Sequence, residues 1–207
     1  MQIQQKPMML YAQALEERGI PAVSFVEGEI NCAAEVKMII SLLKILDNPL
    51  QDIPLAAVMM SPVFGFNSTQ LANIRMGANR RTPLYRSVVT AANNGDIKCK
   101  SFLDKIDSIR RVGIGMGAAE LLRRIFDETG ILSIAKALSS PEQRVANLHS
   151  LLDCASGFDS SGGCGLSAFL RYIEKSKGVG TEYSVAENSH AVKVMNTHKS
   201  KGLEFPV

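Results

Sequence analysis

The chain has 207 residues and 46% of them are hydrophobic, so it can bury a core and is not an intrinsically disordered segment. Its 23 Lys and Arg against 20 Asp and Glu give a formal charge of +3, a bias too small to indicate nucleic-acid binding by itself. No apolar stretch has the length of a signal peptide or a membrane span, and the four cysteines form no CxxC pair. These features predict a cytoplasmic protein with reduced thiols, without membrane contact and without a metal site.

The first predicted elements are a helix and a short strand. Residues 8–18 place apolar side chains on one helical face, and Gly19 stands where a left-handed residue is expected after the last turn. Pro21 prevents the helix from continuing. The apolar, β-branched stretch AVSFV at 22–26 then predicts a buried strand.

The long middle of the chain has the pattern of successive helices. Residues 33–46 carry apolar side chains at helical spacing, and the pattern stops at Asp47-Asn48-Pro49. A short helix follows Asp52 and Pro54 and ends at 60–62, and another is expected at 68–76.

Cap residues predict where the later helices begin. Thr82 before Pro83 predicts an N-cap with proline at the first helical position, for a helix that ends at 93–95. Asp96 is expected to cap the next helix, and Ser140-Pro141-Glu142-Gln143 fits a capping box. Further helices are predicted at 118–128 and 166–176, and GIGMG at 113–117 is interpreted as a turn between helices.

A second strand signal, AVKVMN at 191–196, lies far from the first. Parallel neighbouring strands need a crossover connection, and here the crossover would have grown into a helical domain. The predicted fold is therefore mainly α: a helical insertion at 31–177, with short strands at both chain ends from an α/β domain. Residues 1–30 and 190–207 are expected to belong to that α/β domain, and the polar, glycine-bearing residues 178–189 form a linker.

The stretch NTHKSKGLE at 196–204 begins where the second strand ends, which is where ligands bind in open α/β sheets. Polar and cationic side chains at Asn196, His198, Lys199 and Lys201 suit phosphate groups, and glycine lets a backbone come close. On residue types alone, a solvated basic turn is an equally good interpretation.

Three stretches resemble a known family. HKSKGLEFPV at 198–207 is similar to the motif that joins the single-stranded DNA channel to the ATP site in the second RecA-like domain of UvrD/Rep-type superfamily 1 helicases. Residues 42–66 and 144–175 are similar to the helical insertion called 2B in the A subunit of bacterial AddAB helicase-nucleases. The resemblance covers the chain from residue 8 to Val207. The chain departs from the family pattern at Asn196, where threonine or serine is usual, and at Met60, where arginine often precedes Ser-Pro.

The resemblance implies that 31–177 is a 2B-like domain and that the chain ends come from RecA-like domain 2A. It implies DNA-binding roles for Asn196, His198, Lys199 and Lys201, and nucleotide-binding roles for Gly202 and Glu204. ATP and Mg²⁺ would be cofactors of the parent protein, which would act on duplex and single-stranded DNA together with a B subunit.

The sequence contains no GxxxxGK[ST] phosphate loop, no acidic helicase box after an apolar strand and no acidic cluster suited to a nuclease metal. The chain is therefore expected to be a fragment that carries half of a composite site and has no ATPase or nuclease activity of its own. An autonomous enzyme is the least favoured alternative.

Two functions remain in competition. In the first, the helical domain is a non-catalytic DNA-contacting part of a helicase-nuclease acting in double-strand-break repair and recombination. In the second, it is a protein-interaction module that docks the partner subunit. A basic face formed by Arg75, Arg80, Arg81 and Arg86 would favour DNA, and an exposed apolar patch would favour the partner.

Overall fold

The structure is a computed structural model that describes residues 33–76 and 82–175, with positions 11, 14, 15, 18–20, 22–24 and 192–194 nearer the chain ends. The chain divides into two compact units. One is Ile30–Gly178, and the other combines Met1–Glu29 with Val179–Val207.

The unit made from the two chain ends contains a parallel pair of short strands. Strand β1 (Ala22–Ser24) pairs with β2 (Val192–Val194), with Ala22 opposite Val192. Gly19 has a φ of +75°, the left-handed conformation expected after the first helix. The linker at 178–189 and the stretch at 196–207 lie outside the described residues, and the assignment of these ends to a RecA-like domain stays a prediction.

The described residues of the other unit form nine helices, which confirms the mainly helical prediction. They are α2 (Ala34–Asp47), α3 (Asp52–Met59), α4 (Ser68–Met76), α5 (Leu84–Asn93), α6 (Ile97–Val112), α7 (Ala118–Thr129), α8 (Ile131–Ala137), α9 (Pro141–Ser160) and α10 (Leu166–Lys175). No described helix is both long and apolar enough to cross a membrane. The identity of this helical unit with a 2B insertion stays a prediction.

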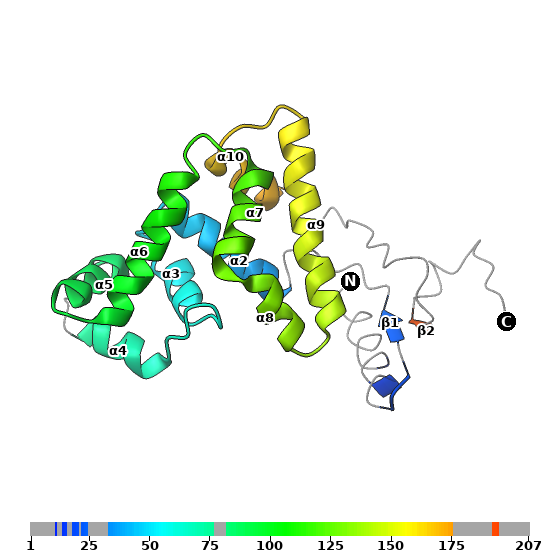
Figure 1. The fold of residues 1–207 in the computed structure, drawn as a ribbon, viewed down its shortest axis with the longest axis horizontal. Coiled ribbons are helices and arrows are strands. Elements are labelled where there is room, and N and C mark those ends of the chain that lie inside the picture. Colours follow the sequence, from blue (N-terminus) through cyan, green and yellow to red (C-terminus); the bar gives the residue numbers. More distant parts are fainter. Residues whose placement is uncertain are drawn as a thin grey trace. The chain divides into compact units, whose positions relative to one another are not determined.

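Helix α2 lies at the centre of the helical unit. It contacts α3 and α6 on one side and α9 and α10 on another (Figure 1). Its sequence is apolar around most of its circumference, and Val36, Ile39 and Leu42 are fully buried. A helix of this kind is stable only when other helices surround it, so α2 holds the two halves of the unit together.

The remaining helices form two groups. Helices α3, α4, α5 and α6 pack at one end, on the left of Figure 1, where the rings of Phe64 and Phe102 meet edge to face at 4.8 Å. Helices α7, α8 and α10 pack on α9 at the other end, where the Phe158 and Phe169 rings lie 5.4 Å apart. The connection between the groups is the predicted turn at 113–117, in which Gly115 has a φ of +86°.

Several helix ends follow the predicted caps. Asp96 accepts a hydrogen bond from the Cys99 amide at 2.9 Å at the start of α6, and α2 ends at Asp47 as expected. Gly130 has a φ of +62° and closes α7 before α8 begins. Local sequence therefore determines these boundaries.

Two predicted caps are wrong. Helix α5 begins at Leu84, so Pro83 rather than Thr82 is its N-cap residue, and the acceptor for its first amide comes from a distant part of the chain. The expected capping box at 140–143 does not form, because Ser140 is left-handed (φ 53°) and makes no side-chain cap. Arg144 instead donates from Nε to the Ser139 carbonyl at 2.8 Å and holds the turn that precedes α9.

Candidate nucleic-acid interface

Only two of the predicted DNA-binding residues lie among the described residues. Arg75 is in the last turn of α4, and Arg86 is exposed on the first turn of α5. Arg80 and Arg81 lie between these helices in sequence, outside the described residues. Asn196, His198, Lys199, Lys201, Gly202 and Glu204 also lie outside them, so the second predicted site stays a prediction.

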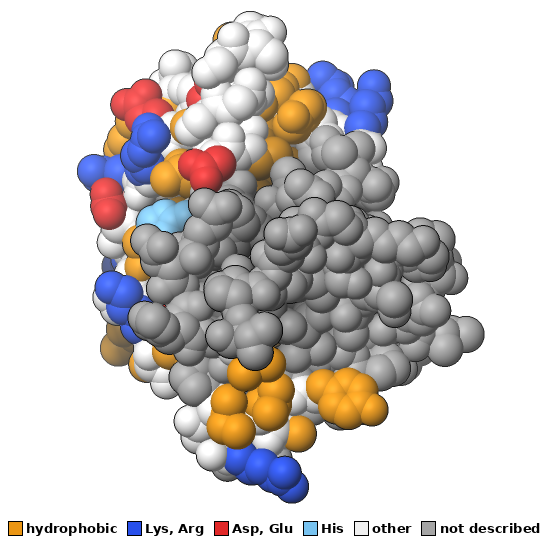
Figure 2. All heavy atoms as spheres, turned by 90° about the vertical axis from the view of Figure 1, so that its right-hand side faces the viewer, with side chains coloured by type: hydrophobic (Ala, Val, Ile, Leu, Met, Phe, Trp, Pro, Cys, Tyr) orange, Lys and Arg blue, Asp and Glu red, His pale blue; other side chains and the backbone are white. Residues whose placement is uncertain are grey.

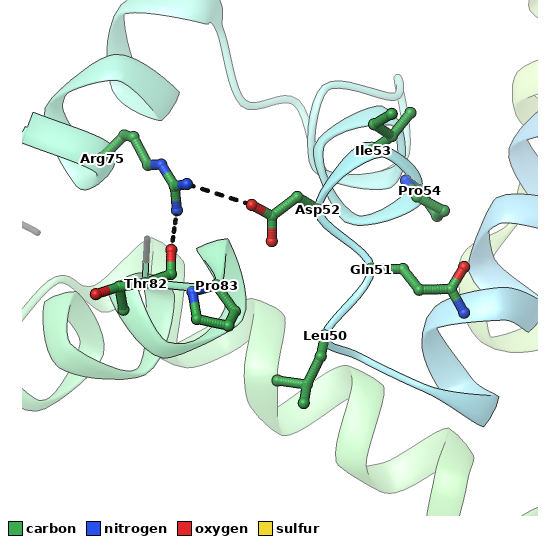
Figure 3. Close-up of a pocket in the computed structure, with 8 residues that line it drawn as sticks. All are labelled: Leu50, Gln51, Asp52, Ile53, Pro54, Arg75, Thr82 and Pro83. Atoms are coloured by element: carbon green, nitrogen blue, oxygen red, sulfur yellow. Dashed lines mark hydrogen bonds and ion pairs between the residues drawn. The ribbon is translucent and has the colours of Figure 1, made fainter. Parts of the chain in front are cut away.

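The Arg75 guanidinium binds two partners at once (Figure 3). Its Nη2 lies 3.4 Å from Oδ2 of Asp52 at the start of α3, and its Nη1 donates to the Thr82 carbonyl that precedes α5. The two side chains are 34% and 42% exposed, so water screens the ion pair. Arg75 therefore connects α4 to both neighbouring helices rather than pointing freely into solvent.

Asp52 also supplies the missing cap of α5. Its Oδ1 accepts a hydrogen bond from the Leu84 amide at 2.8 Å, although the two residues are 32 positions apart. The first amides of a helix lack partners within the helix and carry a partial positive charge, so a carboxylate stabilises that end. One carboxylate thus joins the start of α3, the end of α4 and the start of α5, and we call the Asp52–Arg75–Thr82 arrangement the α4–α5 clip.

Two hollows adjoin the clip. The first, of about 500 Å³, is lined by Leu50, Gln51, Asp52, Ile53, Pro54, Arg75, Thr82 and Pro83 (Figure 3). The second, of about 430 Å³, lies against Ala56, Leu71, Ala72 and Leu84 and shares Asp52, Ile53 and Arg75. Its walls are mainly apolar.

Exposed apolar side chains stand in the same region. Ile53, which lines both hollows, is 85% exposed, and Met76 at the end of α4 is 81% exposed. The region therefore combines the expected basic residues with an apolar surface, the two features that were expected to distinguish a DNA contact from a partner contact.

Other cations of the helical unit hold helices together. Arg110 on α6 donates from Nε to the Leu46 carbonyl at 3.1 Å and from Nη2 to the Ile45 carbonyl at 3.0 Å, and so caps the end of α2. Arg144 on α9 pairs at 2.7 Å with Glu35 on α2, a carboxylate whose side chain is 7% exposed. These roles were not predicted, because the partners lie more than 60 positions apart in sequence.

Charges of both signs are mixed on the visible surface. On the face shown in Figure 2, Lys and Arg side chains stand beside Asp and Glu side chains over the described part of the molecule. A basic footprint would therefore have to be local, as at the α4–α5 end, because the described surface on this face has no extended field of one sign.

The described thiols are unsuited to nucleophilic chemistry. Burial, followed by the neighbouring Asp96 carboxylate, raises the pKa of Cys99 to about 12, and burial raises the pKa of Cys154. Thiols of this kind stay protonated at neutral pH and do not attack electrophiles. Among the described residues no group of three His, Cys, Asp or Glu side chains could hold a metal ion.

The chain is similar to proteins named as the A subunit of an ATP-dependent helicase/nuclease. It is 35% identical to the one from Oceanobacillus iheyensis over 206 residues and 35% identical to the one from Acetivibrio thermocellus over 206 residues. It is 37% identical to the one from Pelotomaculum thermopropionicum over 205 residues. These matches cover 95% to 96% of this chain but only 16% of each relative.

No protein-family model matches the chain. The pairwise similarity is nevertheless uniform in extent and identity across relatives from different bacteria, and it agrees with the family that residues 42–66, 144–175 and 198–207 resemble. The chain therefore belongs to the family of ATP-dependent helicase/nuclease A subunits and corresponds to one segment, 16% of the length, of its members.

Proposed function

We propose that the helical unit is a non-catalytic, 2B-like domain that contacts duplex DNA within an ATP-dependent helicase-nuclease acting in double-strand-break repair and recombination. The observation that carries the proposal is the similarity to helicase/nuclease A subunits over nearly the whole chain. The α4–α5 end supports it, because Arg75, Arg80, Arg81 and Arg86 lie within twelve positions of sequence at one end of the unit.

The binding expected of such a domain is weak and independent of DNA sequence. A few Arg and Lys contacts to phosphates give a dissociation constant of about micromolar or poorer at physiological salt. Each phosphate neutralised also releases counterions, so the affinity should fall steeply as salt rises. Duplex DNA with a single-stranded end is the ligand that presents both structures expected for the parent protein.

Fluorescence anisotropy with this DNA, from low to physiological salt, tests the proposal. We expect the Arg80→Ala/Arg81→Ala double variant to lose salt-sensitive binding. The matched control is Arg123→Ala/Lys136→Ala, which removes the same charge from exposed positions on α7 and α8, at the other end of the unit (Figure 1). Equal loss in both double variants would show a general charge effect and no DNA interface at α4–α5.

The stretch at 196–204 is proposed to complete a site with other parts of the parent protein. The resemblance supports DNA contacts from Asn196, His198, Lys199 and Lys201, and contacts of Gly202 and Glu204 with ATP bound as its Mg²⁺ complex. Because the sequence has no phosphate loop, this chain alone should release no phosphate from ATP above the blank in the presence of single-stranded DNA. Turnover that co-purifies with the chain would contradict this view.

A second candidate function is docking of a partner protein, such as the B subunit of the helicase-nuclease. The exposed Ile53 and Met76 beside the two hollows favour it. Absence of DNA binding even at low salt, together with capture of the purified B subunit by the wild type and loss of capture by Ile53→Asp, would establish docking in place of DNA contact.

A further inference from the structure

We infer that Asp52 and Arg75 are positioning residues, which fix the ends of the segment that carries Arg80 and Arg81, and that Arg75 is not itself a phosphate ligand. The inference rests on the proposed DNA-contacting function and divides the arginine cluster into residues that bind and residues that hold.

The first observation is where the clip lies in the chain. Arg75 donates to the Thr82 carbonyl seven positions later, and Arg80 and Arg81 lie between these two residues. The hydrogen bond therefore joins the residues at which the segment leaves α4 and enters the turn before α5. Tying the two ends of a connection together reduces the conformations that it can adopt.

The second observation is that α4 depends on polar contacts for its placement. None of its residues is buried, whereas α3 buries Leu55, Val58 and Met59. Asp52 projects from the first residue of this well-packed helix and reaches both Arg75 and the Leu84 amide. The clip thus transfers the fixed position of α3 to the end of α4 and the start of α5.

The third observation concerns the environment of the guanidinium. A phosphate that approached Arg75 would meet the Asp52 carboxylate, 3.4 Å from the guanidinium, and two negative groups repel. It would also have to replace the hydrogen bond to Thr82. Both effects disfavour Arg75 as a phosphate ligand, whereas an arginine without a neighbouring carboxylate would bind without these costs.

The decisive variant is Asp52→Asn. Its amide oxygen can still accept the Leu84 hydrogen bond, while the ion pair with Arg75 is lost and the net charge rises by one. If Arg75 bound phosphate directly, this variant would bind DNA more tightly than wild type. If Arg75 is a positioning residue, it should bind about fivefold more weakly at equal salt, the factor expected when one further residue must be ordered on binding.

Arg75→Ala should weaken binding to a similar degree, and the double variant no more than the weaker single variant, because both remove one device. Asp153→Asn, an equal charge change at an exposed position on α9, is the matched control and should not weaken binding. Tighter binding by Asp52→Asn, with weaker binding by Arg75→Ala, would overturn the inference.

A readout without DNA separates this inference from the proposed function. Trypsin cleaves after Arg80 and Arg81, and its rate under native conditions, followed by mass spectrometry, reports how well their segment is held. We expect cleavage there to be several-fold faster in Asp52→Asn and Arg75→Ala than in wild type or Asp153→Asn. Unchanged rates would refute the positioning role, whereas faster cleavage without any DNA binding by the wild type would refute only the DNA-contacting function.

Discussion

Replacement of Asp159 by alanine should destabilise the helical unit more than any other single change of an exposed or half-exposed carboxylate on α9. Asp159 lies near the end of α9 but caps a different helix. Its Oδ1 accepts from the Ala118 amide and its Oδ2 from the Ala119 amide, both at 2.9 Å, at the start of α7. The perturbation therefore removes two hydrogen bonds and a negative charge from one helix N-terminus.

The expected loss follows from these two contacts. Hydrogen bonds to a charged acceptor contribute about 1.5 kcal/mol each, which sets an upper figure of about 3 kcal/mol. Water can reach the half-buried Asp159 site and solvate the freed amides, so part of that figure is recovered. We expect a decrease of about 2 kcal/mol in the free energy of unfolding, at the upper end of measured N-cap losses.

Urea unfolding followed by far-ultraviolet circular dichroism measures the loss. Asp159→Asn retains one acceptor oxygen and loses the charge, so it should cost about 1 kcal/mol. Asp153→Ala, at an exposed position on the same helix, should change stability by less than about 0.5 kcal/mol. If Asp159→Ala and Asp153→Ala had equal effects, the capping argument would be refuted.

Three further outcomes are expected. Gly117→Ala would place a Cβ 2.8 Å from Oδ2 of Asp159, so it should lower the urea midpoint in the same direction as loss of the cap, whereas an unchanged midpoint would show that the carboxylate moves aside freely. Arg144→Ala leaves the buried Glu35 carboxylate without its cation and should cost about 3 kcal/mol in the same assay, and Lys136→Ala, an exposed cation on α8, serves as its control. Folding raises the pKa of Cys99 from 9.0 to about 12, so the folded state holds this proton more tightly; its contribution to stability is complete below pH 9 and is lost as pH rises towards 12. Cys99→Ala should flatten the fall in stability over that interval, and an identical pH profile for wild type and variant would contradict the assignment.

The sequence predicted the helices well where the signals were local. Asp96 caps α6 with its own side chain, and Gly130 ends α7 in the left-handed conformation, because both effects act within one turn of the residue concerned. The apolar spacing in α2 likewise predicted a buried helix, since the side chains that a helix buries are fixed by its period.

The failures arise from contacts between distant parts of the chain. The cap of α5 comes from Asp52 and the cap of α7 from Asp159, and no local pattern shows that these carboxylates will meet those amides. The capping box expected at Ser140 had the correct residue types, but the turn before α9 placed Ser140 in a left-handed conformation. Tertiary contacts decided each of these ends.

The candidate site was predictable only in part for the same reason. Clustering of arginines in sequence indicated a basic region, but it could not show that Arg75 faces Asp52 and the Thr82 carbonyl while Arg86 is exposed. A carboxylate at the start of one helix and an arginine at the end of another are common separately. Their meeting depends on how α3, α4 and α5 pack, which the spacing of residues within each helix does not specify.

The central position of α2 has a consequence for synthesis on the ribosome. Lys44 on α2 pairs with Glu174 on α10 at 2.9 Å, and the two residues are 130 positions apart. At about 5 to 20 residues per second, a nascent chain needs roughly 6 to 26 seconds to add that much sequence. During this interval the apolar surface of α2 that α9 and α10 finally cover is available to chaperones and to other nascent chains. Slower translation of the segment between α6 and α10 should therefore lower the soluble yield, whereas slowing upstream of α2 should not.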